Sequence, residues 1–210
     1  MTTHGTSRGT LRDLDDATQA LVRLAVVISA GTDHQVMDAI ARARNTMPPE
    51  WVEELILQTH LFAGFPRALN AMRAWRRVSP EPVSPASTGG TSEWRETGET
   101  TCAAVYGDMY ERLRQNIRQL HPALDDWMII EGYGKVLSRP GLDLARRELC
   151  IVAACAASGQ DRQLHSHLHG ARNVGVEPGV LDGVIDAIAD LLGDARARSV
   201  RLLWARVRGK

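Results

Sequence analysis

The chain has 210 residues, of which 44% are hydrophobic, so it can bury the core of one large domain or of two small ones. Its 25 basic and 25 acidic residues cancel to a formal net charge of zero, which gives no reason to expect a nucleic-acid or membrane-surface partner. No apolar run is long enough to predict a transmembrane helix, and the first residues lack the apolar core of a signal peptide. Cys102, Cys150 and Cys155 show no CxxC spacing, so the sequence predicts a reduced, cytoplasmic protein.

Apolar residues recur at helical spacing along most of the chain, and we find no convincing strand. Residues 1–9 are small and polar and predict a loose tail. The first half is expected to form four helices, at 11–30, 33–45, 49–63 and 66–77. Gly31 and Gly64-Phe65-Pro66 are the expected helix ends, and Asp33 is the expected N-cap of the second helix.

Residues 78–100 are rich in Pro, Gly, Ser and Thr and have no apolar period, which predicts an exposed linker. The second half is expected to form further helices at 101–120, 122–134, 144–158, 178–192 and 194–207. One more helix is expected after residue 158, with Asp161 as its N-cap. The sequence thus predicts an all-α fold in which a first unit, 10–77, and a second unit, 101–208, form one intertwined domain.

Two of these helices, joined by a tight turn at Gly159, carry the most informative residues. Glu148 falls on the apolar face of the first helix, and His167 falls on the apolar face of the second. An unpaired buried carboxylate is costly, so a buried Glu and a buried His are best explained by contact with each other. Spacing alone leaves open whether this contact is a structural hydrogen bond or an active-site pair.

The sequence also contains an internal repeat. An offset of 128 residues places Gly31 on Gly159 and brings together five further identical pairs, at 33/161, 35/163, 43/171, 44/172 and 45/173. This predicts a duplicated helical unit with a pseudo-twofold arrangement. At the same offset Ala20 lies opposite Glu148, Ala39 opposite His167, and Gly64 opposite Leu192. Each half therefore keeps features that the other lacks, which suggests one composite site.

The stretches YGKVLSRPGLDLARREL, QLHSHLHGARNVGV and EELILQTHLFAGFPRALNAM resemble the carboxymuconolactone decarboxylase family. This resemblance implies an all-α fold of helical hairpins, similar to alkylhydroperoxide reductase D, that assembles into rings. Two fused units look like a covalent dimer, so the resemblance implies a homotrimer with six pseudo-equivalent units.

The peroxidase branch of this superfamily uses a Glu, a CxxC pair and a His four residues after the second cysteine. Glu148 and His167 match that pattern, but Gln160 and Gln163 stand at the cysteine positions. An amide cannot replace a nucleophilic thiolate, so we do not expect thiol peroxidase activity.

The other branch resembles the decarboxylase proper, a lyase of aromatic catabolism that acts on 4-carboxymuconolactone without a cofactor. By this resemblance we expect cofactor-free acid–base chemistry, with no metal, on a small lactone or keto acid. Glu148, His167 and His60 are the expected catalytic residues, and Gln163, Phe65 and Tyr133 are the expected substrate-binding residues.

Four alternatives remain open at this stage. His60 suits a satisfied core histidine as well as a site residue. His165 and His169 are spaced i, i+4, a geometry that can hold zinc, although no third ligand is obvious. The chain could also be a degenerate, thiol-independent member of the superfamily, or a non-catalytic oligomeric module that kept the fold.

Overall fold

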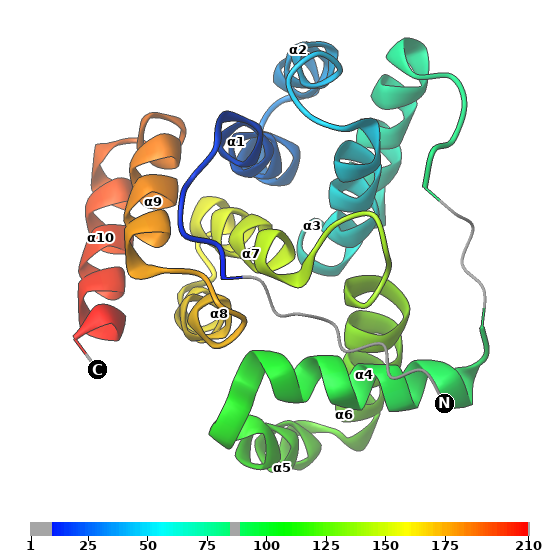
Figure 1. Cartoon of the computed structure of the whole chain (residues 1–210), viewed down its shortest axis with the longest axis vertical. Helices are drawn as coiled ribbons and strands as arrows, with labels where there is room; N and C mark the ends of the chain where they lie inside the picture. Colours follow the sequence, from blue (N-terminus) through cyan, green and yellow to red (C-terminus); the bar gives the residue numbers. More distant parts are fainter. Residues whose placement is uncertain (1–9, 85–88, 210) are drawn as a thin grey trace.

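The computed structural model describes residues 10–84 and 89–209, and the described residues form helices without a β-sheet (Figure 1). The expected all-α class is therefore confirmed. The elements are α1 (Asp16–Ala30), α2 (Asp33–Ala43), α3 (Pro49–Val78), α4 (Thr91–Tyr106), the short η1 (Gly107–Met109), α5 (Tyr110–Leu120), α6 (Pro122–Trp127), the π-helical η2 (Met128–Leu137), α7 (Leu144–Ser158), α8 (Asp161–Asn173), α9 (Pro178–Leu192) and α10 (Asp194–Arg208). The expected tail at 1–9 lies outside the described residues. Among the helices described, none combines the length and apolar character needed to cross a membrane.

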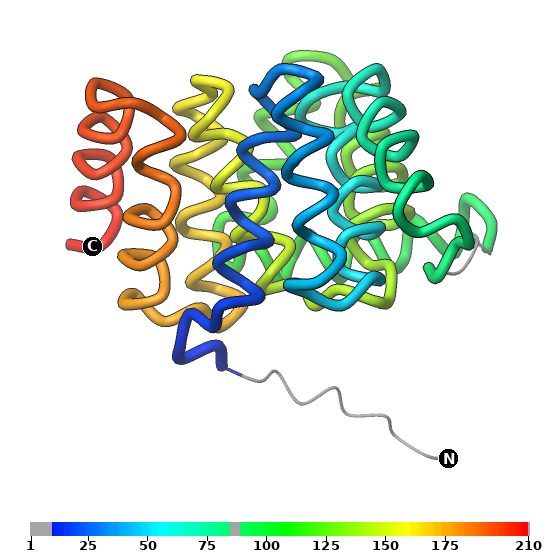
Figure 2. The backbone as a smooth tube through the Cα atoms, turned by 90° about the horizontal axis from the view of Figure 1, so that it is seen from above, coloured from blue at the N-terminus to red at the C-terminus, as the bar shows by residue number. Residues whose placement is uncertain are grey.

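The internal repeat is visible in the order of the helices. Helices α1, α2 and α3 are followed, after an inserted segment, by α7, α8, α9 and α10. Viewed from above, the helices of both repeats stand side by side, from α10 at one end to α3 at the other (Figure 2). Helix α3 contains a break at Gly64, whose φ and ψ are 81° and 161°, so its two halves correspond to α9 and α10. The two helices expected at 49–63 and 66–77 are therefore present.

The break also corrects the sequence alignment by one residue. Gly193 separates α9 from α10 with φ 75° and ψ 158°, nearly the same conformation as Gly64. Gly64 thus corresponds to Gly193 and not to Leu192, because the stretch from Asn173 to Pro178 is one residue longer than the equivalent stretch from Asn45 to Pro49. The positive φ explains why glycine stands at both breaks. At the corrected offset of 129, Ala189 is the counterpart of His60.

Paired hydrogen bonds establish the duplication independently of the backbone. The indole N–H of Trp75 donates to Glu53 Oε1 at 3.1 Å, and the indole N–H of Trp204 donates to Asp182 Oδ1 at 2.7 Å. Both members of one pair lie 129 residues from the members of the other. Each repeat therefore fastens its last two helical segments with the same tryptophan–carboxylate contact.

The two repeats meet along α1 and α7. Arg146 Nε donates to Thr18 Oγ1 at 2.9 Å, and these two residues are equivalent under the 128-residue offset. Equivalent residues can touch each other only beside the axis that relates the two repeats. Asp15 and Asp143, which are also equivalent, cap the N-termini of α1 and α7, and Arg146 pairs with both carboxylates. These contacts place the pseudo-twofold axis between α1 and α7.

The inserted segment differs from the expected linker. Helix α4 begins at Thr91, so residues 91–100 of the expected linker are helical. Apolar spacing missed this helix because it packs through a glycine. A Cβ built at Gly98 would lie 2.1 Å from the carbonyl oxygen of Ile129, and one at Gly134 would lie 1.9 Å from that of Trp94. Close backbone contact replaces large side chains between α4 and η2.

Other boundaries differ by small amounts. The helix expected at 101–120 is interrupted at Gly107, whose φ of 53° ends α4 and separates it from α5. Thr32, not Asp33, caps α2, in a capping box with Gln35. Gln160 takes the cap position of α8 that Asp161 was expected to fill. Helix α6 continues into η2, so this stretch ends at Leu137, beyond the expected glycines.

Candidate active site

Glu148 and His167 contact each other in the core, as their positions on two apolar helix faces predict. Gly159, with φ 71°, ends α7 in the left-handed conformation and returns the chain into α8. This turn brings His167 Nδ1 to 2.8 Å from Glu148 Oε2. Glu148 is fully buried and His167 is 5% exposed. Because Nδ1 faces the carboxylate, Nε2 is the ring nitrogen available to another molecule.

The glycine at position 170 makes room for the Glu148 carboxylate. A Cβ at Gly170 would lie 2.7 Å from Glu148 Oε2 and 2.7 Å from Val105 Cγ1. Helix α4 is held against α8 here, because Asn173 Nδ2 donates to the carbonyl oxygen of Val105 at 2.8 Å. Among the described residues, no hydrogen-bond partner reaches the second carboxylate oxygen, Oε1. The carboxylate thus keeps one oxygen for a proton or a donor that the fold itself does not supply.

A cavity of about 470 Å³ adjoins His167. Its walls come from α3, the α4–α6 region, η2 and α8, and most of its lining residues are apolar: Leu61, Phe62, Tyr106, Leu113, Ile117, Leu124, Trp127, Met128, Glu131, Gly132, Tyr133, Leu137, Arg162, Gln163, Ser166 and His167. Its size and composition are typical of small-molecule sites.

Two tyrosines complete the polar part of this wall. The Tyr106 ring lies 6.5 Å from the His167 ring and 6.1 Å from the Tyr133 ring. Burial raises the pKa of Tyr106 above its usual range, and the nearby charge of Glu148 adds to this effect. Burial likewise raises the pKa of Tyr133. Both side chains therefore stay neutral phenols that can donate hydrogen bonds at ordinary pH.

The structure brings together four of the six predicted site residues. Gln163, Tyr133 and His167 line the cavity, and Glu148 lies behind His167. His60 and Phe65 are not among the lining residues. His60 Nδ1 donates to the carbonyl oxygen of Leu57 at 2.7 Å, its ring stacks on Phe65 at 4.7 Å, and Phe65 is 64% exposed. His60 and Phe65 therefore lie outside the lining of the cavity that they were expected to complete.

The first repeat nevertheless contributes to the site through residues that the sequence did not single out. Leu61 and Phe62 line the cavity, and the edge of Phe62 meets the His167 ring at 5.8 Å. Phe62 lies two residues before Gly64, so the Gly-Phe-Pro motif pointed to the right segment of the first repeat. The sequence also did not single out Tyr106, the last residue of α4, directly before Gly107.

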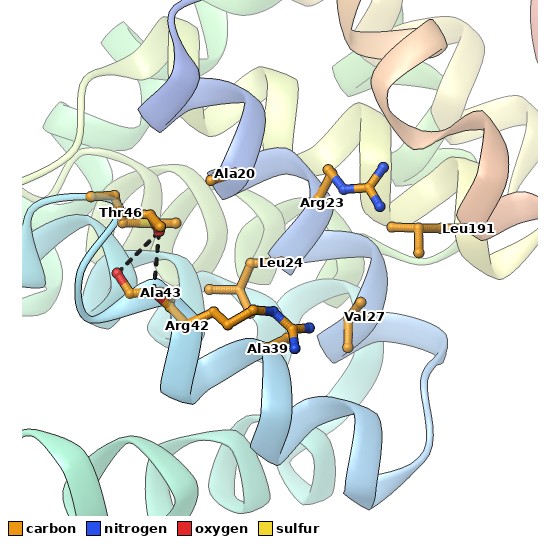
Figure 3. Close-up of a pocket in the computed structure, with 10 residues that line it drawn as sticks. Ala20, Arg23, Leu24, Val27, Ala39, Arg42, Ala43, Thr46 and Leu191 are labelled. Atoms are coloured by element: carbon orange, nitrogen blue, oxygen red, sulfur yellow. Dashed lines mark hydrogen bonds between the residues drawn. The ribbon is translucent and has the colours of Figure 1, made fainter.

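The equivalent position in the first repeat has no acid–base pair. Figure 3 shows Ala20 and Ala39, the counterparts of Glu148 and His167, beside a cavity of about 220 Å³ between α1 and α2. Arg42 stands in place of Gly170, and Leu191 in place of Phe62. The same helical scaffold therefore packs with two methyl groups where the second repeat has two ionisable groups. The fold alone does not require Glu148 and His167.

The three cysteines are free and buried. Burial raises the pKa of Cys102 and of Cys155 to about 12, and it also raises the pKa of Cys150. They are therefore thiols at neutral pH. The rings of His165 and His169 contact each other at 4.9 Å, but the described part of the chain holds no group of three or more His, Cys, Asp or Glu placed to bind a metal ion.

Comparison with known proteins agrees with the architecture. Peroxisomal protein 2 of Saccharomyces cerevisiae is 25% identical over 153 residues, which cover 59% of this chain and 54% of that protein. The chain thus spans about half the length of this curated relative. No solved structure matches. The sequence profile of the carboxymuconolactone decarboxylase family matches residues 2–77 and 107–206, one segment for each repeat. The chain therefore belongs to the carboxymuconolactone decarboxylase family.

Proposed function

We propose that this protein is a cofactor-free acid–base enzyme, of the decarboxylase or lyase type, that acts on a lactone or keto acid in the cavity beside His167. The observation that carries the proposal is the buried Glu148–His167 contact, 2.8 Å long, at the wall of a cavity of about 470 Å³. The alanines of the first repeat add support, because a residue pair that folding does not need calls for another explanation.

In this proposal His167 exchanges the proton and Glu148 positions it. Glu148 accepts from Nδ1–H, fixes the tautomer and stabilises the imidazolium, as a carboxylate does in other His-centred sites. In a decarboxylation the bond to the carboxylate carbon breaks and CO₂ leaves. The electron pair moves into the neighbouring carbonyl group as an enolate. Nε2 of the imidazolium then protonates the enolate carbon, and His167 regains its proton from water.

The neutral phenol of Tyr106 suits the enolate oxygen, and the Tyr133 hydroxyl, which is hydrogen-bonded to Tyr106, supports it. A donor that stays protonated in a largely apolar cavity stabilises developing negative charge without having to reorganise. Gln163 lies one helical turn before His167 and offers an amide that can both donate to and accept from a carbonyl or carboxyl group. His60 has no part in this mechanism.

The proposal extends to assembly and location. We propose a cytoplasmic homotrimer in which six pseudo-equivalent units form a ring. Phe65 and Leu69 support an interface, because they lie one turn apart on α3 and are 64% and 53% exposed. Light scattering on the purified chain measures the mass. A monomer at micromolar concentration contradicts the trimer without bearing on the chemistry.

A substrate screen tests the reaction itself. Wild type, His167→Ala, Glu148→Gln and Cys150→Ser are assayed against lactones, β-keto acids and hydroperoxides. We expect turnover of a lactone or keto acid that both site substitutions abolish and that Cys150→Ser leaves intact. Hydroperoxide turnover that survives both site substitutions but is lost in Cys150→Ser contradicts the proposal.

A further inference from the structure

The cavity beside His167 continues into an apolar surface on α5 and α6. Leu113 and Ile117 line it from α5, and Leu124 and Trp127 line it from α6. Leu124 is 47% exposed and Trp127 is 62% exposed although both belong to the cavity wall. The wall therefore extends from the imidazole out to solvent as a continuous apolar path.

The cavity lining holds few charged side chains. Glu131 and Arg162 are the charged side chains among the lining residues, and Lys135 Nζ already lies 3.1 Å from Glu131 Oε2. Arg162, the cation among these lining residues, lies on α8 with His167, so the lining residues on α5 and α6 offer a second carboxylate no cation. The rest of the wall offers mostly apolar side chains, against which an unpaired carboxylate is costly.

We infer that the substrate is an amphiphile: a keto acid or lactone with a single carboxyl or lactone head and an apolar body that lies along α5 and α6. This inference rests on the proposed function, since it takes the site beside His167 as the reacting end. The head faces His167, Tyr106 and Gln163. The body replaces water along Phe62, Ile117 and Trp127. A compact dicarboxylate is the substrate class that this wall disfavours.

The apolar path sets a quantitative expectation. Each buried methylene group improves the dissociation constant about fourfold, until the cavity is full. Binding of unreactive linear carboxylates is measured by calorimetry with hexanoate, octanoate and decanoate, below their aggregation concentrations. Each is compared with the α,ω-dicarboxylate of equal length. We expect the fourfold gain per methylene for the monocarboxylates and at least tenfold weaker binding of each dicarboxylate.

Matched variants assign this binding to the proposed surface. Trp127→Ala and Ile117→Ser should flatten the chain-length dependence, and Trp127→Ala removes a side chain that is 62% exposed. Leu202→Ala, on α10, removes a leucine that is 63% exposed and should leave the dependence unchanged. The inference is overturned if affinity does not depend on chain length, or if dicarboxylates bind as tightly as monocarboxylates. It is also overturned if all three variants have equal effects.

The outcome is separable from that of the proposed function. Chain-length-dependent binding without turnover of any lactone or keto acid leaves the binding class in place and contradicts the enzyme proposal. Turnover of a short dicarboxylate that is lost in His167→Ala supports the enzyme proposal and overturns the inference that the substrate is an amphiphile.

Discussion

Nδ1 of His167 lies 2.8 Å from Oε2 of Glu148, while the other oxygen of the same carboxylate, Oε1, has no hydrogen-bond partner within the described residues. The two side chains are 5% exposed and fully buried, respectively. A buried pair with one unused acceptor costs stability that an apolar pair would not. The first repeat carries that apolar solution at Ala20 and Ala39, so the two repeats form an internal comparison.

Substitution of either member should remove activity on the substrate that the screen identifies. We expect kcat/KM to fall about 10²-fold or more in His167→Ala, because the proton donor is lost. Glu148→Gln should lower kcat more than it raises KM, since the amide no longer offsets the positive charge that the imidazole carries during proton transfer. An unchanged kcat in Glu148→Gln would contradict the positioning role of the carboxylate. Circular dichroism of each variant controls for loss of fold.

The same pair should be strongly non-additive in stability. Removing one partner of this buried contact leaves a polar group without its hydrogen bond, at a cost of about 1–3 kcal/mol. We expect the double variant Glu148→Ala/His167→Ala to be destabilised by less than the sum of its single variants, since the double variant leaves neither group unpaired. Urea unfolding of all four proteins gives the coupling energy. Strict additivity would mean that the two groups do not stabilise each other.

Gly170→Ala should disable the site although it substitutes no ionisable residue. The added methyl would meet Glu148 Oε2 and Val105 Cγ1, each at 2.7 Å, so the carboxylate must move away from His167. We expect kcat/KM to fall at least about tenfold, with destabilisation of about 1–3 kcal/mol from overpacking. Gly179→Ala, on α9, is the control, because nothing lies within 4 Å of its added Cβ. Equal activities of the two variants would contradict this role of Gly170.

Much of the fold could be predicted because the helices are amphipathic and punctuated by glycine and proline. The break at Gly64 and the turn at Gly159 were predictable, since both are left-handed positions that favour glycine. Helix α4 was not predictable by the same rule. It packs on η2 by backbone contact at Gly98 and Gly134. Its sequence therefore lacks the regular spacing of apolar residues that predicts a helix.

The site was half predictable for a related reason. Glu148 and His167 stood out because they are ionisable residues on apolar faces, a signal that lies within single helices. Which part of the first repeat reaches them depends on how α3 packs against the inserted segment, and helix periodicity does not encode that. Phe62 lines the cavity, whereas His60, two residues earlier on the same helix, stacks on Phe65.

The cysteines should be unreactive in the folded protein. Burial raises the pKa of Cys102 and Cys155 to about 12, so their thiolates are scarce at pH 8. We expect a chromogenic disulfide reagent to titrate no thiol in native protein within minutes and all three in guanidinium chloride. Rapid labelling of native protein would contradict the buried positions and reopen thiol chemistry for this chain.

The hairpin of α5 and α6, which lines the proposed substrate path, should depend on Asp125. Burial acts to raise the pKa of Asp125, but hydrogen bonds and charge from Arg114 and Arg118 outweigh it and hold that pKa below its usual value of 3.8. Arg114 Nη2 donates to Asp125 Oδ2 at 2.8 Å, and Arg118 Nε donates to the same oxygen at 2.7 Å. Asp125→Asn removes the negative charge and leaves the Arg114 guanidinium buried without its carboxylate.

We therefore expect Asp125→Asn to cost about 3–5 kcal/mol at neutral pH, and we expect Asp126→Asn, which breaks an exposed pair with Arg95, to cost about 1 kcal/mol or less. The pH dependence follows from the sign of the shift. A lowered folded-state pKa gives stability that is fully present above the unfolded pKa, about 3.9, and is lost as the pH falls through the folded pKa. The gap between wild type and Asp125→Asn should thus stay constant from neutral pH to about pH 5 and narrow in more acid solution. Urea unfolding at several pH values measures this gap. A gap that widens in acid would mean that Asp125 is held protonated in the folded chain, with the arginines held by other contacts.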